Sequence, residues 1–325
     1  MSEGPPSDPV DVDASAASIE SVSEVERLAA EVRENVGRVI VGHDDAIQDV
    51  ITAILGRGHV LIDDVPGVGK TMLARSIARS VDCSFRRIQF TPDMLPSDVT
   101  GVTVFDQQAQ TFEFQPGPIF ANIVLGDEIN RAPPKTQSAL LEAMEEEQVT
   151  VDGDSRPLPD PFAVIATQNA VEPDRTYDLP LAEVDRFMKR LHLGYPNPSE
   201  ETAMLKRTVG HHPIESLEPV TDGTALVQAR LIVADVAMDE AVRSYASRLA
   251  AHTRDRARIG VSPRGTIALL RASQARAAVQ GRGFVTPDDI KAEVQPVLAH
   301  RIRTGQADRD GSSVVTEALE QVSVE

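Results

Sequence analysis

A glycine-rich loop, DDVPGVGKT at residues 63–71, has the residue types that bind a triphosphate. In such loops the backbone N–H groups at a helix N-terminus point at phosphate oxygens, and glycines allow the phosphates to approach closely. Lys70 would reach the β- and γ-phosphates, and the Thr71 hydroxyl would bind Mg²⁺. Asp64 stands where the pattern G-x-x-x-x-G-K-[ST] begins with glycine. Because that position starts the turn, far from the phosphates, we predict a nucleotide site, with a helix-capping glycine turn as the alternative.

Two adjacent carboxylates, Asp127 and Glu128, follow the apolar run NIVLG. The carboxyl ends of parallel strands form the edge at which α/β proteins bind ligands. There Asp127 would hold Mg²⁺ through its water shell, and Glu128 would act as a general base on an attacking water. Alone, such a pair is also typical of a solvated strand end. Together with the upstream loop it favours a site of nucleotide hydrolysis.

Three further polar residues are candidates for contact with a γ-phosphate. Asn169 follows the buried run FAVIATQ, Arg186 lies at a helix end in LAEVDRF, and Arg264 lies in the first turn of the helix predicted for SPRGTIALL. An arginine brought to the γ-phosphate from a neighbouring subunit contributes about 10³–10⁵ in turnover in related enzymes. Taken singly, each residue is also typical of an ordinary turn or surface position.

Short apolar runs alternate with helical patterns between residues 58 and 193, which is typical of a buried parallel sheet with helices on both faces. The expected strands are HVLI, FRRIQF, NIVLGDE, FAVIATQ and KRLHLG. Two strand–turn–strand patterns, at residues 99–114 and 148–162, indicate hairpin insertions. We therefore expect an α/β nucleotide-binding domain over residues 21–197, beginning with an amphipathic helix at 22–36.

After residue 197 only helical spacing is present. Several of these segments open with Ser-Pro or Thr-Pro, which suits an N-cap followed by proline at the first helical position. Residues 198–310 are expected to form an all-helical domain, and residues 311–325 a tail with a short helix. Residues 1–20 are rich in Ser, Pro, Asp and Ala, and we expect a disordered acidic arm there.

The formal net charge of the 325 residues is −18, so a phosphate-rich polymer would be repelled and broad nucleic-acid binding is disfavoured. No run is long and apolar enough for a membrane span, and the N-terminus is acidic where a signal peptide is basic, so a cytoplasmic location is expected. Such acid-rich, lysine-poor usage resembles that of halophilic archaeal proteins, with an ordinary acidic cytosolic protein as the alternative. The single cysteine, Cys83, excludes an intramolecular disulfide.

These segments, in this order, resemble the MoxR family of AAA+ ATPases between about residues 34 and 303. The resemblance rests on VIVGHDDAI, DVPGVGKT, TPDMLPSDVTG, FQPGPIFANIVLGDEINRAPPKTQSALLEAMEE, FAVIATQN, TYDLPLAEVDRF, SPRGTIALLRA and VTPDDI. It implies an α/β AAA+ P-loop NTPase core with a parallel sheet, a helix-2 insert and a pre-sensor-1 hairpin, followed by an all-α lid domain. It also implies hydrolysis of ATP with Mg²⁺.

The resemblance also assigns roles to residues. It makes residues 64–71 the Walker A motif, Asp127 and Glu128 the Walker B pair, Asn169 sensor 1 and Arg264 sensor 2. Arg186 is the expected arginine finger, with Arg131 as a second candidate. The implied catalytic set is Glu128, Lys70, Asn169, Arg186 and Arg264, and the implied Mg²⁺ ligands are Thr71 and Asp127. The nucleotide is expected to contact Val41, Gly42, Asp64, Val65, Pro66, Gly67, Val68, Gly69, Lys70, Thr71 and Met72.

Finally, the resemblance implies a homo-oligomeric ring, expected to be hexameric, in which ATP hydrolysis drives chaperone-like maturation or remodelling of a client protein. Such clients often carry a von Willebrand factor A domain. Two alternatives remain: a nucleotide-gated scaffold with little turnover, and a DNA-linked AAA+ motor. The second is disfavoured because the tips of the predicted hairpins, DQQAQ and DGDSRPLP, hold one arginine between them.

Overall fold

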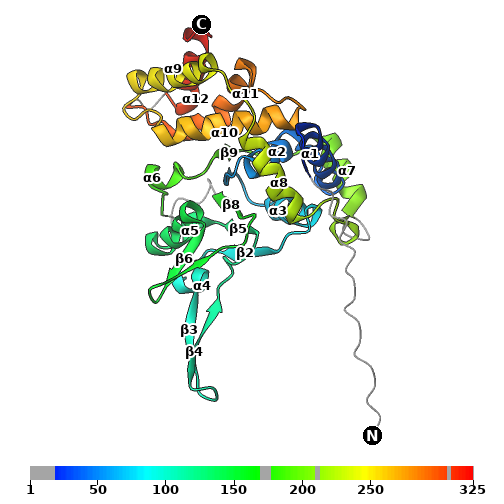
Figure 1. The fold of residues 1–325 in the computed structure, drawn as a ribbon, viewed down its shortest axis with the longest axis vertical. Coiled ribbons are helices and arrows are strands. Elements are labelled where there is room, and N and C mark those ends of the chain that lie inside the picture. The colour runs from blue at the N-terminus through cyan, green and yellow to red at the C-terminus, as the bar shows by residue number, and fades with distance from the viewer. Residues whose placement is uncertain (1–18, 169–176, 209–212, 306–308, 325) are drawn as a thin grey trace.

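The computed structural model describes residues 19–168, 177–208, 213–305 and 309–324. Within these ranges a five-stranded parallel sheet has the order β2-β5-β8-β1-β9 (Figure 1). Its strands are β1 (Val60–Asp63), β2 (Phe85–Gln89), β5 (Ile123–Asp127), β8 (Ala163–Gln168) and β9 (Lys189–Leu191). All five coincide with the predicted apolar runs. Because β5, β8 and β1 are adjacent, their carboxyl ends form one edge.

Side chains alternate between the two buried faces of the sheet, as strand geometry requires. In β1, Val60 and Ile62 pack on the hydrophobic cluster that includes α1 (Val22–Gly37), α2 (Asp44–Leu55) and α3 (Lys70–Ser80). Leu61 packs on the opposite face, in a second cluster with side chains of α5 (Pro134–Glu146). Burial on both faces explains why these strands are continuously apolar in sequence.

Both predicted hairpin insertions are present. The first follows the short helix α4 (Pro96–Thr100) and consists of β3 (Gly101–Asp106) and β4 (Thr111–Pro116). It projects from the end of the molecule opposite the lid (Figure 1) and carries a pair of exposed rings, Phe105 and Phe112, with centroids 5.1 Å apart. The second hairpin, β6 (Gln148–Val151) and β7 (Asp154–Pro157), follows α5.

The lid is helical, as predicted. Its longest elements are α7 (Pro198–Thr208), α8 (Gly223–Ala234), α9 (Glu240–Arg256), α10 (Pro263–Val279), α11 (Pro287–Leu298) and α12 (Gly311–Gln321). At α10 the Ser262 hydroxyl accepts a hydrogen bond from the backbone N–H of Gly265, and Pro263 fills the first helical position, as the Ser-Pro pattern predicts. The tail expected at residues 311–325 contains α12, which packs against α9 and α11 and so is part of the lid.

The lid and the core domain share one continuous hydrophobic cluster. Leu226 and Val233 of α8, Leu269 of α10 and Val294 of α11 belong to the same cluster as the α1–α3 face of the sheet. A buried arginine of α8, Arg230, adds polar contacts to the core domain, because it donates to the backbone oxygens of Ile54 at 2.9 Å and Phe162 at 3.1 Å. The lid is therefore packed on its own core domain, and the two share one hydrophobic core.

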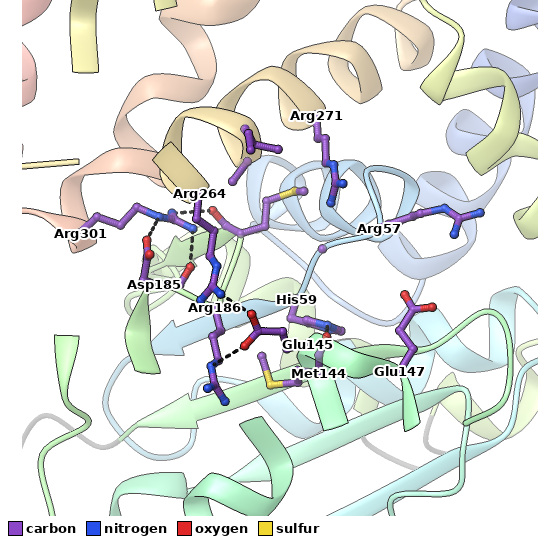
Figure 2. A pocket seen from close by; sticks show the side chains of 14 residues that line it. Arg57, His59, Met144, Glu145, Glu147, Asp185, Arg186, Arg264, Arg271 and Arg301 are labelled. Carbon is purple, nitrogen blue, oxygen red and sulfur yellow. Dashed lines mark hydrogen bonds and ion pairs between the residues drawn. The ribbon is translucent and has the colours of Figure 1, made fainter. Parts of the chain in front are cut away.

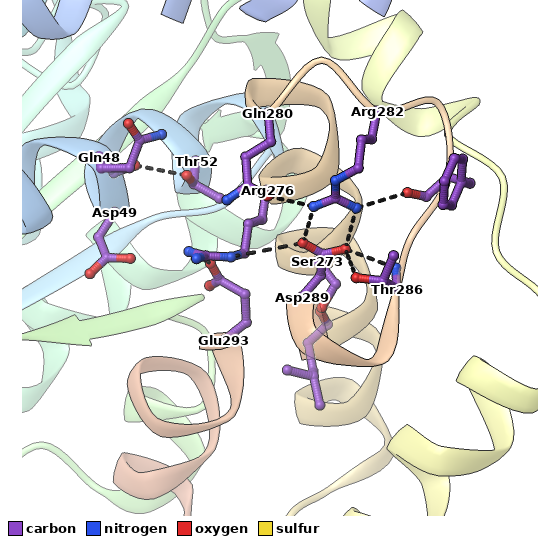
Figure 3. A network of polar contacts seen from close by, with 12 residues as sticks. Gln48, Asp49, Thr52, Ser273, Arg276, Gln280, Arg282, Thr286, Asp289 and Glu293 are labelled. Atoms are coloured by element: carbon purple, nitrogen blue, oxygen red, sulfur yellow. Dashed lines mark hydrogen bonds and ion pairs between the residues drawn. The ribbon is translucent and has the colours of Figure 1, made fainter. Parts of the chain in front are cut away.

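A chain of charged side chains crosses the same boundary, and Figure 3 shows its members on α10 and α11 together with Asp49 of α2. Lys189 at the start of β9 is fully buried, and its Nζ lies 2.8 Å from Asp49 Oδ1 and 2.5 Å from Glu293 Oε2 of α11. Arg276 of α10 lies within 3.9 Å of both Glu293 and Asp289, and Arg282 binds the Asp289 carboxylate. The network connects β9 and α2 with α10 and α11.

The acidic arm predicted for residues 1–20 falls largely outside the described residues, which begin at Ile19. Ile19 is buried in the shared hydrophobic cluster, and its N–H donates to Gln228 Oε1 at 2.8 Å. In the described ranges, no helix combines the length and apolar character that a membrane crossing demands.

Candidate active site

The glycine-rich loop connects β1 with α3, which begins at Lys70. Gly67 and Gly69 have φ values of +88° and +94°, and no heavy atom lies within 4 Å of the position that a Cβ would occupy on either residue. Only glycine adopts this backbone at little cost, and the missing side chains leave the loop surface open. The first N–H groups of α3 have no partner within the helix, so the surface is suited to an anion.

A cavity of about 380 Å³ lies over this loop. Its walls come from three elements, namely the loop with the start of α3, the end of β2 and the end of β5. The lining residues are Pro66, Gly67, Gly69, Lys70, Thr71, Met72, Arg87, Gln89, Asp127 and Glu128. The structure thus brings the loop and both predicted carboxylates to one cavity, and adds two residues of β2 that we did not predict.

Lys70 is folded back onto its own loop. Its Nζ donates to the backbone oxygens of Asp64 at 2.9 Å and Val65 at 3.2 Å. An ammonium group is a flexible donor whose weak contacts to carbonyls can be exchanged for charge-assisted contacts to phosphate. The lysine is therefore held close to the position at which a triphosphate would sit.

Asp64 faces away from the cavity. Its Oδ2 accepts hydrogen bonds from the backbone N–H groups of Leu193 and Gly194, each at 2.6 Å, and its Oδ1 accepts one from Val65 at 2.8 Å. These contacts fasten the head of the loop to the segment that follows β9 and leads into the lid. A glycine at this position would leave those N–H groups without this acceptor.

Asp127 ends β5 and has both carboxylate oxygens engaged. Oδ1 accepts a hydrogen bond from Thr167 Oγ1 at 2.6 Å, and Oδ2 accepts from Arg87 Nη2 at 2.6 Å. The fully buried Thr167 hydroxyl also accepts from the backbone N–H of Glu128 at 2.9 Å. One hydroxyl of β8 therefore positions both members of the carboxylate pair.

Glu128 is in the left-handed region, with φ 57° and ψ 49°, so the chain turns sharply after Asp127. Its Oε2 accepts hydrogen bonds from Gln89 Nε2 at 2.7 Å and Arg131 Nη1 at 2.8 Å. Arg131, our second candidate for contact with a neighbouring subunit, thus pairs with the carboxylate of its own chain.

Gln89 and Arg87 of β2 were missed in the sequence. Strand register places Gln89 opposite Asp127, and Arg87 two residues earlier points to the same side. The detectable signal was a pair of polar residues at alternate positions in the otherwise strand-like run FRRIQF.

The remaining predicted nucleotide contacts are less closely grouped. Val41 and Gly42 do not line the loop cavity, and Gly42, with φ +81°, is covered by the Glu200 side chain of α7. Val65 and Val68 also lie outside the lining residues. Asn169, predicted to be sensor 1, lies outside the described residues.

Arg186 and Arg264 lie at the other edge of the sheet. They line a second cavity of about 510 Å³ between the core domain and the lid (Figure 2). This cavity is also lined by His59, which directly precedes β1, and by Met188, which directly precedes β9. The loop cavity instead involves residues that follow β1 and end β5. Neither arginine lines the loop cavity of its own chain.

The two arginines meet at one carboxylate. Arg186 Nε lies 3.3 Å from Glu145 Oε2, and Arg264 Nη2 contacts Glu145 Oε1 (Figure 2). Arg186 also lies 3.4 Å from Glu183. Glu145 at the end of α5 was not predicted. The arrangement shows that both guanidinium groups can reach a single anion.

His59 closes the floor of the second cavity. Its Nε2 donates to the backbone oxygen of Met144 at 2.9 Å, and its Nδ1 accepts from the Val164 N–H at 3.0 Å. Burial lowers the pKa of His59 to about 4. The neutral ring thereby joins β1, β8 and the end of α5, which carries Glu145.

The sequence matches two family models, one described as the ATPase family associated with various cellular activities (AAA) over residues 59–189, and one as the AAA lid domain over residues 249–322. The chaperone MoxR1 of Mycobacterium tuberculosis is 38% identical, with 85% of this chain and 78% of that protein covered. The protein MoxR of Methylorubrum extorquens is 30% identical, with 84% and 87% covered. The chain belongs to the MoxR family of AAA+ ATPases.

Two further similarities agree with this family. The uncharacterized protein YeaC of Bacillus subtilis is 49% identical over 277 residues, covering 85% of this chain and 87% of that protein. The crystal structure of a protein from Cytophaga hutchinsonii superposes with a TM-score of 0.87 at 35% identity, covering 93% of this chain and 96% of the other. The MoxR family assignment confirms the predicted AAA+ core with an all-α lid.

Proposed function

We propose that this MoxR-family chain is a Mg²⁺-dependent ATPase that works as a ring, in which each nucleotide is contacted by two arginines of the neighbouring subunit. The observation that carries the proposal is the separation of the two cavities. The glycine loop and the carboxylates lie at the carboxyl edge of the sheet, whereas Arg186 and Arg264 lie together at the opposite edge.

The loop cavity fits a nucleotide triphosphate with Mg²⁺. The open surface over Gly67 and Gly69 accommodates phosphates, Lys70 is held beside it, and Thr71 and Asp127 supply the oxygen atoms that Mg²⁺ prefers. When bound, Mg²⁺ neutralises the charge on the β- and γ-phosphates. The Val39–Gly42 segment and α7 would flank the adenine, because Glu200 of α7 already covers Gly42.

Glu128 is the proposed general base. It is the second residue of the carboxylate pair and lines the same cavity. Its left-handed backbone turns the side chain away from the direction of β5. Gln89 and Arg131 both donate to its Oε2 and thereby orient the carboxylate, whose other oxygen, Oε1, would accept the proton from water.

The arginines are proposed to act in trans. A closed ring of identical subunits repeats one heterologous contact, which brings the arginine edge of one subunit to the loop edge of the next. Arg186 and Arg264 would then exchange Glu145 for the γ-phosphate of the neighbour. Since lid and core domain share one hydrophobic cluster, we propose that each subunit moves as a unit and that nucleotide-driven motion occurs between subunits.

The biological work is proposed to be maturation or remodelling of a client protein in the cytoplasm, with a von Willebrand factor A domain as the expected client feature. Support comes from a relative named a chaperone, MoxR1 of Mycobacterium tuberculosis. A pull-down with the Glu128→Gln variant, which should retain ATP and its client, identifies the partner. Recovery of the same proteins with Lys70→Ala, which should not bind ATP, contradicts nucleotide-dependent client binding.

The central experiment measures phosphate release with and without Mg²⁺, from low to molar salt, for the wild type and Glu128→Gln. We expect release that needs Mg²⁺ and is lost in the variant, while ATP binding is kept. Binding without release at any salt would make the chain a nucleotide-gated scaffold. Light scattering with ATP measures the mass of the assembly and so tests the ring. A monomer under every condition contradicts the proposal that Arg186 and Arg264 act in trans.

A further inference from the structure

Asp185, the residue before Arg186, joins the core domain to two separate parts of the lid. Its Oδ1 accepts a hydrogen bond from Arg301 Nε at 2.7 Å, its Oδ2 accepts from Ser262 Oγ at 2.9 Å, and its backbone oxygen accepts from Arg301 Nη2 at 3.0 Å. All three acceptors of Asp185 are thus used by the lid.

Arg301 fixes the chain on both sides of Arg186. Besides Asp185, it donates to the backbone oxygens of Phe187 at 2.7 Å and Met188 at 3.2 Å. The Arg301 side chain is only 2% exposed. Its pKa is lowered by burial to about 10, with Asp185 opposing that shift, so it stays charged at neutral pH. A buried fork of this kind specifies geometry more strictly than a surface ion pair.

Ser262 extends the same contact to Arg264. It is the N-cap of α10, so its hydroxyl accepts from Gly265 N–H while it donates to Asp185. Arg264 is the second residue of that helix. A Cβ on Gly265 would lie 2.6 Å from Arg301 Cδ, so the glycine makes room for Arg301 to cross the first turn of α10.

We propose that Asp185 is a positioning residue that holds Arg186 and Arg264 at one fixed separation, so that both reach the same phosphate of a neighbouring subunit. This inference rests on the proposed function of the two arginines in trans. Asp185 directly precedes Arg186 in the chain. Its carboxylate also accepts a hydrogen bond from Ser262, the N-cap of α10, which lies two residues before Arg264. In this arrangement both guanidinium groups contact one anion, the carboxylate of Glu145.

The first test is Asp185→Asn, which keeps the shape of the side chain but replaces an acceptor oxygen with a donor. A displacement of about 1 Å at catalytic groups costs on the order of 10²-fold in rate. We therefore expect kcat for ATP to fall by about tenfold to a hundredfold, with unchanged affinity for a non-hydrolysed ATP analogue, because the variant's own loop is intact. The matched control is Asp160→Asn, which removes another Asp–Arg contact between core domain and lid, to Arg230, and should keep wild-type turnover.

The second test mixes subunits. Glu128→Gln subunits cannot hydrolyse ATP but supply intact arginines, and Asp185→Asn subunits have an intact hydrolytic site. A mixture should release phosphate well above the sum of the two separate activities. Arg186→Ala with Glu128→Gln is the reference mixture. If this reference shows no gain, the proposed action in trans has failed. If the reference gains but the Asp185→Asn mixture does not, or if Asp185→Asn alone turns over like the wild type, the positioning role is overturned.

A milder variant covers the case in which Asp185→Asn does not fold. Ser262→Ala removes one hydrogen bond to Asp185, and Ser262→Thr keeps the hydroxyl. We expect the alanine variant to lose several-fold in kcat and to regain it in mixtures with Glu128→Gln, and the threonine variant to approach the wild type. Equal kcat for the wild type, Ser262→Ala and Ser262→Thr overturns the proposal.

Discussion

Glu145 of the core domain and Arg264 of the lid form an ion pair, and the same carboxylate also contacts Arg186. The Glu145 side chain is 35% exposed and that of Arg264 48% exposed, so solvent screens this contact. Exposed pairs of this kind contribute at most about 1 kcal/mol to stability. The pair therefore contributes little to folding and leaves the arginines available for another anion.

The first prediction follows from this exposure. Glu145→Gln should lower the free energy of unfolding by less than about 1 kcal/mol. Urea unfolding of the wild type and the variant at the same pH and salt measures the difference. A loss of several kcal/mol would mean that Glu145 is a structural residue and that the arginines are not readily released.

The buried pair between Lys189 and Glu293 should behave differently. Both side chains are at most 1% exposed, so neutralising Glu293 leaves a buried ammonium with Asp49 as its remaining carboxylate partner. Removing one member of a buried pair costs roughly 3–5 kcal/mol. For Glu293→Gln we expect the free energy of unfolding, measured in the same urea experiment, to fall by about 3 kcal/mol. A change as small as that of Glu145→Gln contradicts the assigned role of this network.

Thr167 offers a test of the carboxylate pair. Thr167→Val keeps the shape of the side chain but removes the hydroxyl that contacts Asp127 and the backbone of Glu128. We expect Mg²⁺-dependent turnover to fall by at least about tenfold, because a lost hydrogen bond to a charged group is worth about 1.5–3 kcal/mol. Thr52→Val is the control, since this buried hydroxyl donates to Gln48 O of its own helix and lies outside the residues that line the loop cavity. Equal turnover of the two variants would count against the role of Thr167.

Replacing Asp64 with glycine restores the common sequence pattern of the loop and should nevertheless weaken nucleotide binding. The substitution removes the acceptor for the N–H groups of Val65, Leu193 and Gly194. Each N–H group left without a partner costs about 1–3 kcal/mol when buried. We expect ATP affinity to fall about tenfold by titration calorimetry, in line with the lower end of that cost. Tighter binding by Asp64→Gly would show that Asp64 is a defect of the loop.

Acid should destabilise the fold through His59. Its pKa in the folded chain, about 4, is below its ordinary value near 6.5, so the unfolded chain binds more protons between these values. The stabilisation is complete above about pH 6.5 and is lost as the pH falls towards 4, with a slope of up to about 1.4 kcal/mol per pH unit. Burial also lowers the pKa of His300, which adds to the effect. Urea unfolding at a series of pH values measures the slope, and constant stability across this range contradicts the prediction.

The sequence was sufficient for the sheet because burial on both faces makes β1, β5 and β8 continuously apolar. It was also sufficient to bring Lys70, Asp127 and Glu128 together, since carboxyl ends of adjacent parallel strands share an edge. The hairpins were predictable from alternation and turn residues.

The supporting residues were not predictable in the same way. Asp185, Ser262 and Arg301 are distant in the chain, and no local pattern connects them. Thr167 looked like one more β-branched strand residue, and its contact with Asp127 depends on strand order. The position of Arg264 away from its own loop depends on how the lid packs, which helical periodicity does not specify.

The shared hydrophobic cluster means that the boundary near residue 197 separates two patterns of secondary structure and does not separate two folding units. A fragment ending there would expose the apolar side chains that α8, α10 and α11 cover, and the isolated lid would expose their partners. The whole chain should therefore unfold in one cooperative transition. Exchange of lids between relatives would require matching surfaces on both sides of the boundary, so lid and core domain are expected to evolve together.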